Sequence, residues 1–214
     1  MAAAMPKMPP MQPSSEALVA PAAAAPRLRI DAGSGMLMAV PQVISPHCDT
    51  RPGGVLPELI VIHGISVPAG QFGGPWIDRL FAGDLPSAAS PQLAALAGLR
   101  VSAHVVIRRD GTPTQYVPFG LRAWHAGVSS YAGRSACNDF SVGIELEGTD
   151  ALPYEPLQYA TLADLIRELC RVYPSLSAQR LVGHSDIAPG RKSDPGPAFD
   201  WPRLRSLLQA IGAP

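Results

Sequence analysis

Hydrophobic residues recur along this chain with two different periods, and each period predicts a different kind of element. Residues 59–62 form a continuous apolar run, which predicts a central strand covered on both faces. Residues 141–147 alternate instead, so the strand they predict has one apolar face and one polar face. The apolar face would carry Val142, Ile144 and Leu146, and the opposite face Gly143, Glu145 and Glu147.

Helical spacing appears in the C-terminal third of the chain. Residues 156–173 place their apolar side chains on one stripe, with a proline at the first position and another just past the end. Asp200 is placed to cap a final helix. Asp110-Gly111 is a typical hairpin turn. Shorter helices are expected at 76–81 and 91–97, and strands at 27–30, 36–40, 104–108, 114–117 and 180–182.

Strands and helices alternate irregularly, which predicts an α/β fold with a central mixed β-sheet flanked by α-helices. The 20 Gly and 24 Pro predict long ordered loops around this sheet. Residues 1–26 hold nine Ala and six Pro, so helix is blocked and little surface can be buried. We expect a disordered extension at 1–26 and a single domain at 27–214.

Composition excludes several classes of function. Formal net charge is zero at pH 7, so the basic footprint of a nucleic-acid-binding protein is missing. No apolar run is long enough to span a membrane, and prolines interrupt every candidate signal sequence near the N-terminus. Three cysteines without a CxxC pair predict free thiols rather than a disulfide framework. We expect a cytoplasmic monomer.

The residues best suited to hold a metal are two histidines and an aspartate. His63 ends the apolar strand at 59–62, His184 follows the strand at 180–182, and Asp194 precedes a stiff Pro-Gly-Pro turn. Imidazole nitrogens and a carboxylate oxygen suit Zn²⁺, and three protein ligands with an open fourth position are typical of a catalytic site. Asp186 competes with Asp194 for the third place. The alternative is that the two histidines never meet.

Two further residues could supply the chemistry at such a centre. Glu145 could accept a proton from water and pass it to a leaving amine. Lys192 could stabilise the oxyanion that forms when a carbonyl is attacked. Alternatively, Glu145 could be an acid at the end of a strand in a surface ion pair, and Lys192 a solvated loop lysine. Glu147 is the alternative carboxylate and would lie nearer to solvent.

Substrate contacts are suggested by an aromatic residue and two arginines. Trp124 could pack on a sugar or an amide, and Arg100 and Arg134 could pair with a carboxylate. Trp124 could equally belong to the core, and both arginines to the surface. His47 and His104 are expected to form hydrogen bonds rather than bind metal.

Several irregular segments resemble consecutive blocks of the AmpD-type N-acetyl-anhydromuramoyl-L-alanine amidases, cytosolic enzymes of bacterial wall recycling. The matching segments are LIVIHG at 59–64, RAWHAG at 122–127, CNDFSVGIELEG at 137–148 and GHSDIAPGRKSDPGP at 183–197. The resemblance implies zinc on His63, His184 and Asp194, with Glu145 as acid/base and Lys192 at the oxyanion. It also implies a muropeptide substrate, an anhydromuramoyl peptide cut at the amide to L-Ala, with Asn138 among its contacts.

The chain departs from this pattern at a few positions. Gly64 stands where the family often has Asn, and Ser185 replaces a common Cys. These changes bear on substrate contacts and leave the metal ligands intact. Two other functions stay open from the sequence: a non-catalytic peptidoglycan-binding module, and a periplasmic amidase acting on intact cell wall.

Overall fold

The computed structural model describes residues 27–86 and 90–210, so the predicted extension at 1–26 lies outside the described residues. The elements that build the main sheet and its cover are β4 (Leu59–Ile65), β5 (Val105–Ile107), β6 (Pro113–Gln115), β10 (Ser141–Glu147), β11 (Leu181–Gly183), α1 (Trp76–Ala82), α3 (Pro156–Val172) and α5 (Trp201–Gln209). The smaller elements are β1 (Ile30–Asp31), β2 (Met36–Leu37), β3 (Cys48–Thr50), β7 (Leu121–Ala123), β8 (Ser130–Tyr131), β9 (Arg134–Ser135), α2 (Pro91–Ala94), α4 (His184–Ile187) and the 3-10 turns η1 (Pro52–Gly54) and η2 (Cys137–Phe140).

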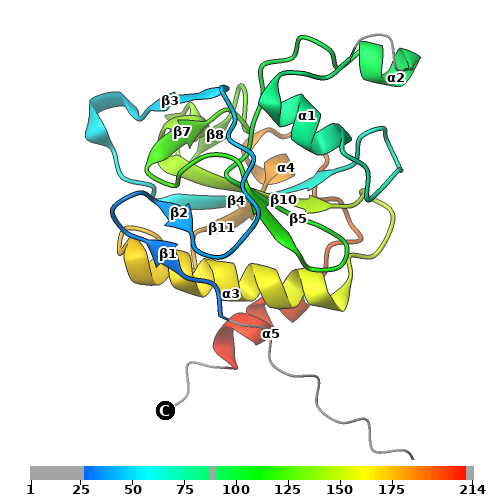
Figure 1. Ribbon diagram of the computed structural model, residues 1–214. Coiled ribbons are helices and arrows are strands. Elements are labelled where there is room, and N and C mark those ends of the chain that lie inside the picture. The colour runs from blue at the N-terminus through cyan, green and yellow to red at the C-terminus, as the bar shows by residue number, and fades with distance from the viewer. Residues whose placement is uncertain (1–26, 87–89, 211–214) are drawn as a thin grey trace, which may run out of the picture.

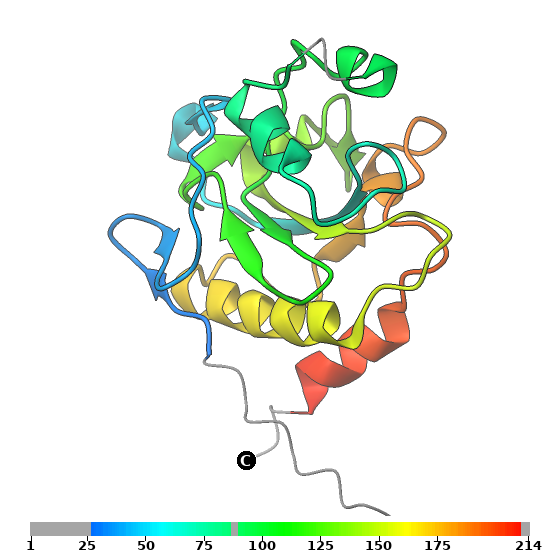
Figure 2. The ribbon, with the colours of Figure 1, turned by 45° about the vertical axis from the view of Figure 1, so that its right-hand side comes forward.

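A five-stranded mixed sheet forms the centre of the domain, with strand order β11-β4-β10-β5-β6. The first four strands are parallel, and β6 returns antiparallel to β5 through the predicted Asp110-Gly111 turn, where Gly111 has φ 84°. The two views agree that α3 lies along one face of the sheet, with α5 on its outer side, and that α1 lies on the opposite side (Figures 1 and 2). The predicted α/β class is therefore confirmed.

One face of the sheet is buried against α3. The predicted alternation in β10 is confirmed, because its apolar residues pack in one core cluster with the helical stripe of α3. The cluster includes Ile60, Ile62, Val142, Ile144, Leu146, Leu162, Leu165, Ile166 and Leu169. Pro156 begins α3, and the Glu155 N–H donates to the Gln158 side chain at 2.9 Å, which closes the first turn.

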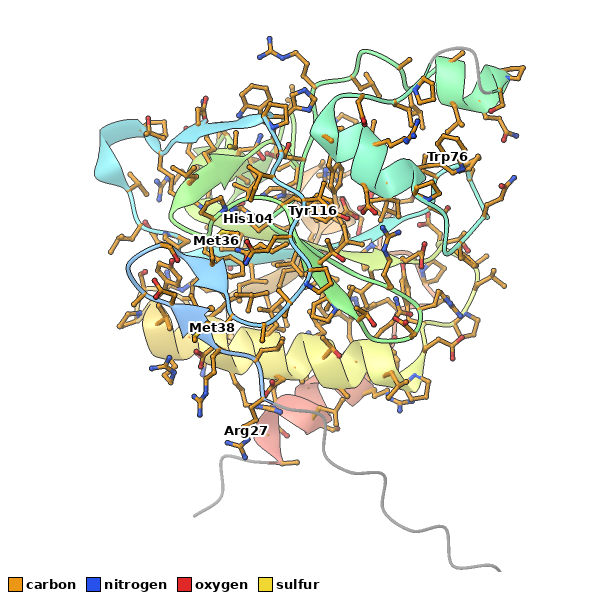
Figure 3. The ribbon with its side chains drawn as sticks, viewed as in Figure 1. Arg27, Met36, Met38, Trp76, His104 and Tyr116 are labelled. Carbon is orange, nitrogen blue, oxygen red and sulfur yellow. The ribbon has the colours of Figure 1, made fainter. Side chains whose placement is uncertain are left out.

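The other face is covered by α1 and the loops around it. Phe81 of α1 contacts Tyr116 edge to face, with 5.0 Å between the ring centroids. Tyr116 and His104 are fully buried and lie in the interior of the molecule, as labelled in Figure 3. Within the described residues no helix is both long enough and apolar enough to cross a membrane, and the three cysteines are free thiols.

Some local predictions differ from the structure. The helix expected at 91–97 is regular only over Pro91–Ala94, because the chain turns toward Gly98, which has φ 84°. No strand is predicted at 122–127, but its first two residues belong to β7, which pairs with β3. That pairing joins segments about seventy residues apart, so no local pattern indicates it. His184 follows β11, as predicted, and begins the short helix α4.

The parallel register is what places the candidate ligands. His63 lies within β4 directly opposite Glu145 of β10, and Gly183 of β11 lies opposite Ile62. His184 therefore follows β11 beside His63. The carboxyl ends of parallel strands are where open α/β sheets bind their ligands.

Candidate metal centre and active site

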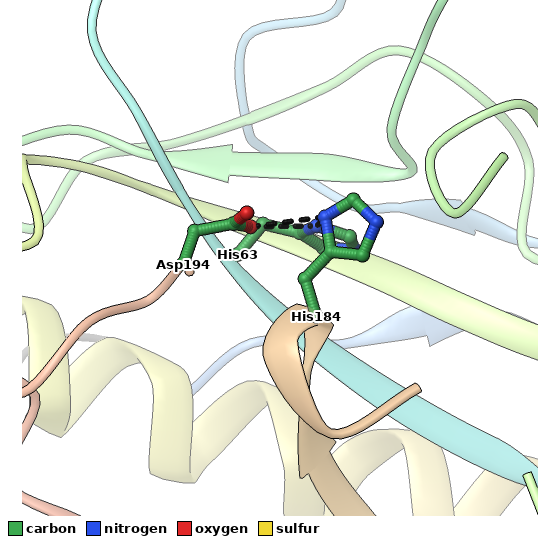
Figure 4. A group of neighbouring side chains, drawn as sticks. All are labelled: His63, His184 and Asp194. Atoms are coloured by element: carbon green, nitrogen blue, oxygen red, sulfur yellow. Dashed lines mark hydrogen bonds and ion pairs between the residues drawn. The ribbon is translucent and has the colours of Figure 1, made fainter. Parts of the chain in front are cut away.

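Two imidazoles and one carboxylate converge at the carboxyl end of the sheet, as predicted (Figure 4). His63 comes from β4, His184 from the start of α4, and Asp194 from the loop after α4. The two Nδ1 atoms lie 3.0 Å apart, and Asp194 Oδ2 lies 3.2 Å from that of His63 and 3.1 Å from that of His184. Within the described residues, His63, His184 and Asp194 are the one group of at least three potential ligands close enough together to hold a metal ion.

These distances fit a tetrahedral metal. Zinc bonds of 2.0 to 2.1 Å at tetrahedral angles separate neighbouring ligand atoms by about 3.3 Å. The three separations of 3.0 to 3.2 Å come close to this value. His184 Nε2 lies 3.1 Å from the carbonyl oxygen of Ala126, which can only accept a hydrogen bond. Its Nε2 therefore carries the proton, and its Nδ1 offers a lone pair to the shared position.

The protonation states also fit metal binding. Burial lowers the pKa of His63 to about 4, so the ring is neutral at pH 7. Burial acts to raise the pKa of Asp194, but contacts with the His184 and His63 rings outweigh it and lower the pKa below its ordinary value. A neutral imidazole and an ionised carboxylate are the forms that bind a metal ion. The residues present therefore fit a divalent cation.

Glu145 is a buried carboxylate without a partner at the edge of this group. Its Oε1 lies 4.0 Å from His63 Nδ1, and its Oε2 is buried with no hydrogen bond. Burial, with the Asp194 carboxylate adding to it, raises the pKa of Glu145 well above its ordinary value. An orphaned buried oxygen costs free energy, so its retention points to a role in chemistry rather than in stability.

Glu147 differs from Glu145 in being fully paired. Its Oε1 accepts from Gly73 N at 2.8 Å and from Arg108 at 3.2 Å, and its Oε2 accepts from Arg109 N. The expectation that Glu147 lies nearer to solvent is wrong, because its exposed fraction is 2% against 9% for Glu145. The salt bridge to Arg108 and two backbone donors compensate for its burial.

A cavity of about 220 Å³ opens onto the metal group. Its lining includes all three candidate ligands, Glu145, Lys192 and Trp124. A larger cavity, about 670 Å³, lies beside Arg108 and Glu147, but its lining contains none of the three ligands. We therefore take the smaller cavity as the reaction site, because function depends on the groups that line a pocket and not on its volume.

The predicted substrate contacts separate into two sets. Trp124 lines the cavity, and the guanidinium of Arg100 lies 5.1 Å from the centre of its ring. Arg134 is placed elsewhere: it pairs with Glu58 at 3.1 Å and lines a separate pocket with Phe140. The structure thus brings Trp124 and Arg100 to the site and leaves Arg134 outside it.

Asn138, a predicted substrate contact, forms hydrogen bonds with the backbone of the loop after β7. Its Oδ1 accepts from the backbone N–H groups of His125 at 3.1 Å and Ala126 at 2.8 Å. This fixes the loop that follows β7, which also supplies the carbonyl contacted by His184.

The competing candidates for metal binding have other partners. Asp186 accepts from Gly183 N at 2.7 Å and so closes the first turn of α4. His47 contacts the Val101 carbonyl and stacks on Trp124. His104 accepts from Gly143 N at 3.0 Å, as a hydrogen-bonded core residue should.

Two features of the site were not predicted from the sequence. His125 Nδ1 lies 2.9 Å from His63 Nε2, and burial lowers the pKa of His125 well below its ordinary value. Gly143 gives the His125 ring its space, since a Cβ there would lie 2.4 Å from the ring. Nothing in the spacing of the RAWHAG segment indicates the contact between His125 and His63.

Gly64, the position that departs from the family pattern, lies against Tyr154. A Cβ at Gly64 would lie 2.2 Å from the Tyr154 hydroxyl, which donates to the Pro195 carbonyl at 3.0 Å. The buried Tyr154 side chain therefore takes the space beside the ligand strand that a residue at position 64 would otherwise fill.

Comparisons with known proteins agree on one family. Residues 53–197 match the model of the N-acetylmuramoyl-L-alanine amidases. The chain is 58% identical over 174 residues to the 1,6-anhydro-N-acetylmuramyl-L-alanine amidase AmpD of Salmonella typhimurium, covering 81% of this chain and 92% of the relative. It resembles a crystal structure of a selenomethionine AmpD derivative with TM-score 0.81 and 56% identity, over 84% of this chain and 98% of that one.

A more distantly similar structure contains a bound muropeptide. The amidase AmiD of Escherichia coli was solved in complex with the substrate anhydro-N-acetylmuramic acid-L-Ala-D-γ-Glu-L-Lys. The present chain resembles it with TM-score 0.53 and 27% identity, over 87% of this chain and 66% of that one.

Proposed function

Because the chain belongs to the N-acetylmuramoyl-L-alanine amidase family, we propose that its substrate is a soluble anhydromuramoyl peptide and that it cuts the amide between the lactyl carbonyl and L-Ala. The matches to the anhydromuramyl amidases and the muropeptide in the AmiD complex support this substrate class. A cytoplasmic place of action in peptidoglycan recycling and a monomeric state remain predictions of the sequence.

We assign the metal ligands to His63, His184 and Asp194, and the ion to zinc. Two neutral imidazoles and a carboxylate form a donor set that zinc prefers, and the three protein ligands leave a position open. When bound, zinc supplies Lewis-acid chemistry that polarises a carbonyl and makes water acidic. The protein orients its ligands and keeps the surrounding cavity narrow.

Glu145 is the proposed acid and base. It lines the cavity, is buried and has a free carboxylate oxygen, so it can take a proton from the attacking water. It then returns this proton to the leaving amine nitrogen of L-Ala. Burial raises the pKa of Glu145, which makes its carboxylate a stronger base toward the attacking water. This unpaired carboxylate beside the ligand group is the observation on which the catalytic proposal depends.

Lys192 is the proposed oxyanion group. Its charged side chain is exposed at the mouth of the cavity and lines it with Glu145 and Asp194. An ammonium at this position attracts the negative charge that develops on the carbonyl oxygen in the tetrahedral state. Trp124 lines the cavity and forms a cation–π pair with Arg100, and its indole offers apolar contact to the substrate at the cavity wall.

The test separates metal binding from turnover. Glu145→Gln keeps the size of the side chain and should bind zinc with wild-type stoichiometry, while its turnover of an anhydromuramoyl tripeptide falls on the order of 100-fold or more. Glu58→Gln, which changes a half-buried acid outside the cavity, is the matched control and should keep full activity. A fully active Glu145→Gln protein would contradict the assignment.

The substrate class is tested with the wild-type protein. Release of peptide from the purified anhydromuramoyl tripeptide should be much faster than from purified sacculi. Faster release from sacculi would reject the soluble substrate, and zinc binding without any release would indicate a peptidoglycan-binding module.

A further inference from the structure

The second nitrogen of His63 is engaged in a chain of hydrogen bonds that begins at His125, which also lines the cavity, and ends at a backbone carbonyl. His63 Nε2 lies 2.9 Å from His125 Nδ1. His125 Nε2 lies 3.2 Å from Ser141 Oγ, and this hydroxyl donates to the Cys137 carbonyl at 2.6 Å. The His63 and Ser141 side chains are buried, and the half-buried His125 ring lies between them.

The direction of this chain follows from its last member. The Cys137 carbonyl can only accept, so the single hydroxyl proton of Ser141 is committed to it. Ser141 Oγ must then accept from His125 Nε2–H, which leaves His125 Nδ1 of the neutral ring as an acceptor. That acceptor faces His63 Nε2, so the His63 proton sits on Nε2 and its Nδ1 carries a lone pair.

The opposite direction is unfavourable. Were Ser141 to donate to His125, two oxygen atoms would face each other at 2.6 Å with no proton between them. His63 would then carry its proton on Nδ1, the atom that lies 3.0 Å from His184 Nδ1. A protonated Nδ1 cannot bind a metal.

We propose that His125 is a positioning residue that holds His63 in the Nε2–H tautomer, so that His63 Nδ1 is permanently available to the metal. The inference deepens the proposed function, since it takes the metal site at His63, His184 and Asp194 as its premise. His125 contacts His63 Nε2, whereas Asp194 contacts His63 Nδ1, and His125 is outside the ligand group, so it influences the metal through the His63 ring.

The surrounding fold is built to seat this ring. Ser141, Gly143 and Glu145 share one face of β10, and the missing side chain of Gly143 leaves the space that the His125 ring fills. Asn138 Oδ1 holds the backbone N–H of His125 at 3.1 Å from the other side. A ring that served only to fill space would not need a hydrogen bond on each nitrogen, one to Ser141 and the other to the metal ligand His63.

Four variants separate tautomer control from packing. His125→Phe keeps an aromatic ring and removes both nitrogens, whereas His125→Gln retains an acceptor and a donor. Ser141→Ala removes the end of the chain without touching His63. Ser129→Ala is the matched control: this buried hydroxyl donates to Gly127 O and accepts from Cys137 N in the same region, but lies outside the chain.

Two readouts decide the proposal. Zinc affinity, measured by competition with a chromophoric chelator, should fall about 10- to 100-fold in His125→Phe and Ser141→Ala and stay within about threefold of wild type in Ser129→Ala. His125→Gln should recover most of the loss. Long-range ¹H–¹⁵N spectra of the metal-free wild type should show the His63 proton on Nε2.

Wild-type zinc affinity in both Ser141→Ala and His125→Phe, or a His63 proton on Nδ1, would overturn the proposal. Should His125→Phe fail to fold, Ser141→Ala and the wild-type spectra still decide it. Failure of the wild type to bind zinc would contradict the proposed function. The His63 tautomer, measured in the metal-free protein, tests the role of His125 independently of zinc binding.

Discussion

Replacing Gly143 by alanine tests whether the His125 ring lies where the structure places it. Gly143 is in the interior of β10, and its φ is outside the left-handed region, so the backbone itself accepts alanine. Glycine within a strand costs about 0.5–1 kcal/mol relative to alanine, so an unobstructed substitution would stabilise the protein. The new Cβ would instead lie 2.4 Å from His125 Cγ and 2.6 Å from its Cδ2 and Nδ1.

The ring or the strand must therefore move. Overpacking of a dense interior typically costs about 1–3 kcal/mol, which exceeds the gain in backbone entropy. We expect Gly143→Ala to lower the free energy of unfolding by about 1–2 kcal/mol, as measured by urea denaturation. Displacing His125 should also weaken zinc binding about tenfold in the chelator assay.

Gly120→Ala is the matched control for this substitution. No heavy atom lies within 4 Å of a Cβ built at Gly120, and its φ is not left-handed either. It should change stability by no more than about 0.5 kcal/mol and leave zinc affinity unchanged. A Gly143→Ala protein as stable as Gly120→Ala, with wild-type zinc affinity, would show that the His125 ring does not occupy this space.

Three further predictions concern catalysis and stability. Lys192→Ala should lower kcat on the order of 100-fold and retain zinc, whereas equal kcat would reject the oxyanion role. Arg51→Met should lower the free energy of unfolding by about 3 kcal/mol, because the buried guanidinium donates to four backbone carbonyls; a loss below about 1 kcal/mol would contradict this. Burial lowers the pKa of His104 to about 3 and that of His63 to about 4, whereas histidines in the unfolded chain bind protons near pH 6.5. The free energy of unfolding should therefore fall by roughly 1.4 kcal/mol per pH unit for each of these two histidines as the pH drops from 6.5 to about 4. A urea midpoint that does not change over this pH range would refute the prediction.

Much of the fold follows from local patterns. The alternation in β10 predicted which of its faces enters the core, and the apolar stripe with Pro156 predicted α3 nearly to its ends. The His/His/Asp set could be chosen because few residue types bind zinc and each stood beside a strand end or a stiff turn. What the sequence does not show is the register, since only the parallel pairing places Glu145 opposite His63.

The errors arose where a partner far along the chain decides the outcome. Glu147 looked solvent-exposed because its compensating contacts come from Gly73 and Arg108. The ion pair of Arg134, which stays a predicted substrate contact, was likewise not visible in the sequence, because its partner Glu58 is 76 residues away. The position of His125 was missed for the same reason, since it depends on the absence of a side chain at Gly143. Tertiary contacts of this kind leave no periodic signal in the sequence.

The account depends most on a single divalent ion held by His63, His184 and Asp194, and the metal content of two aspartate variants tests this directly. Elemental analysis after dialysis should find one zinc per chain in the wild type and in Asp186→Ala, and essentially none in Asp194→Ala. Full zinc in Asp194→Ala, or loss of zinc from Asp186→Ala alone, would contradict the assigned ligands.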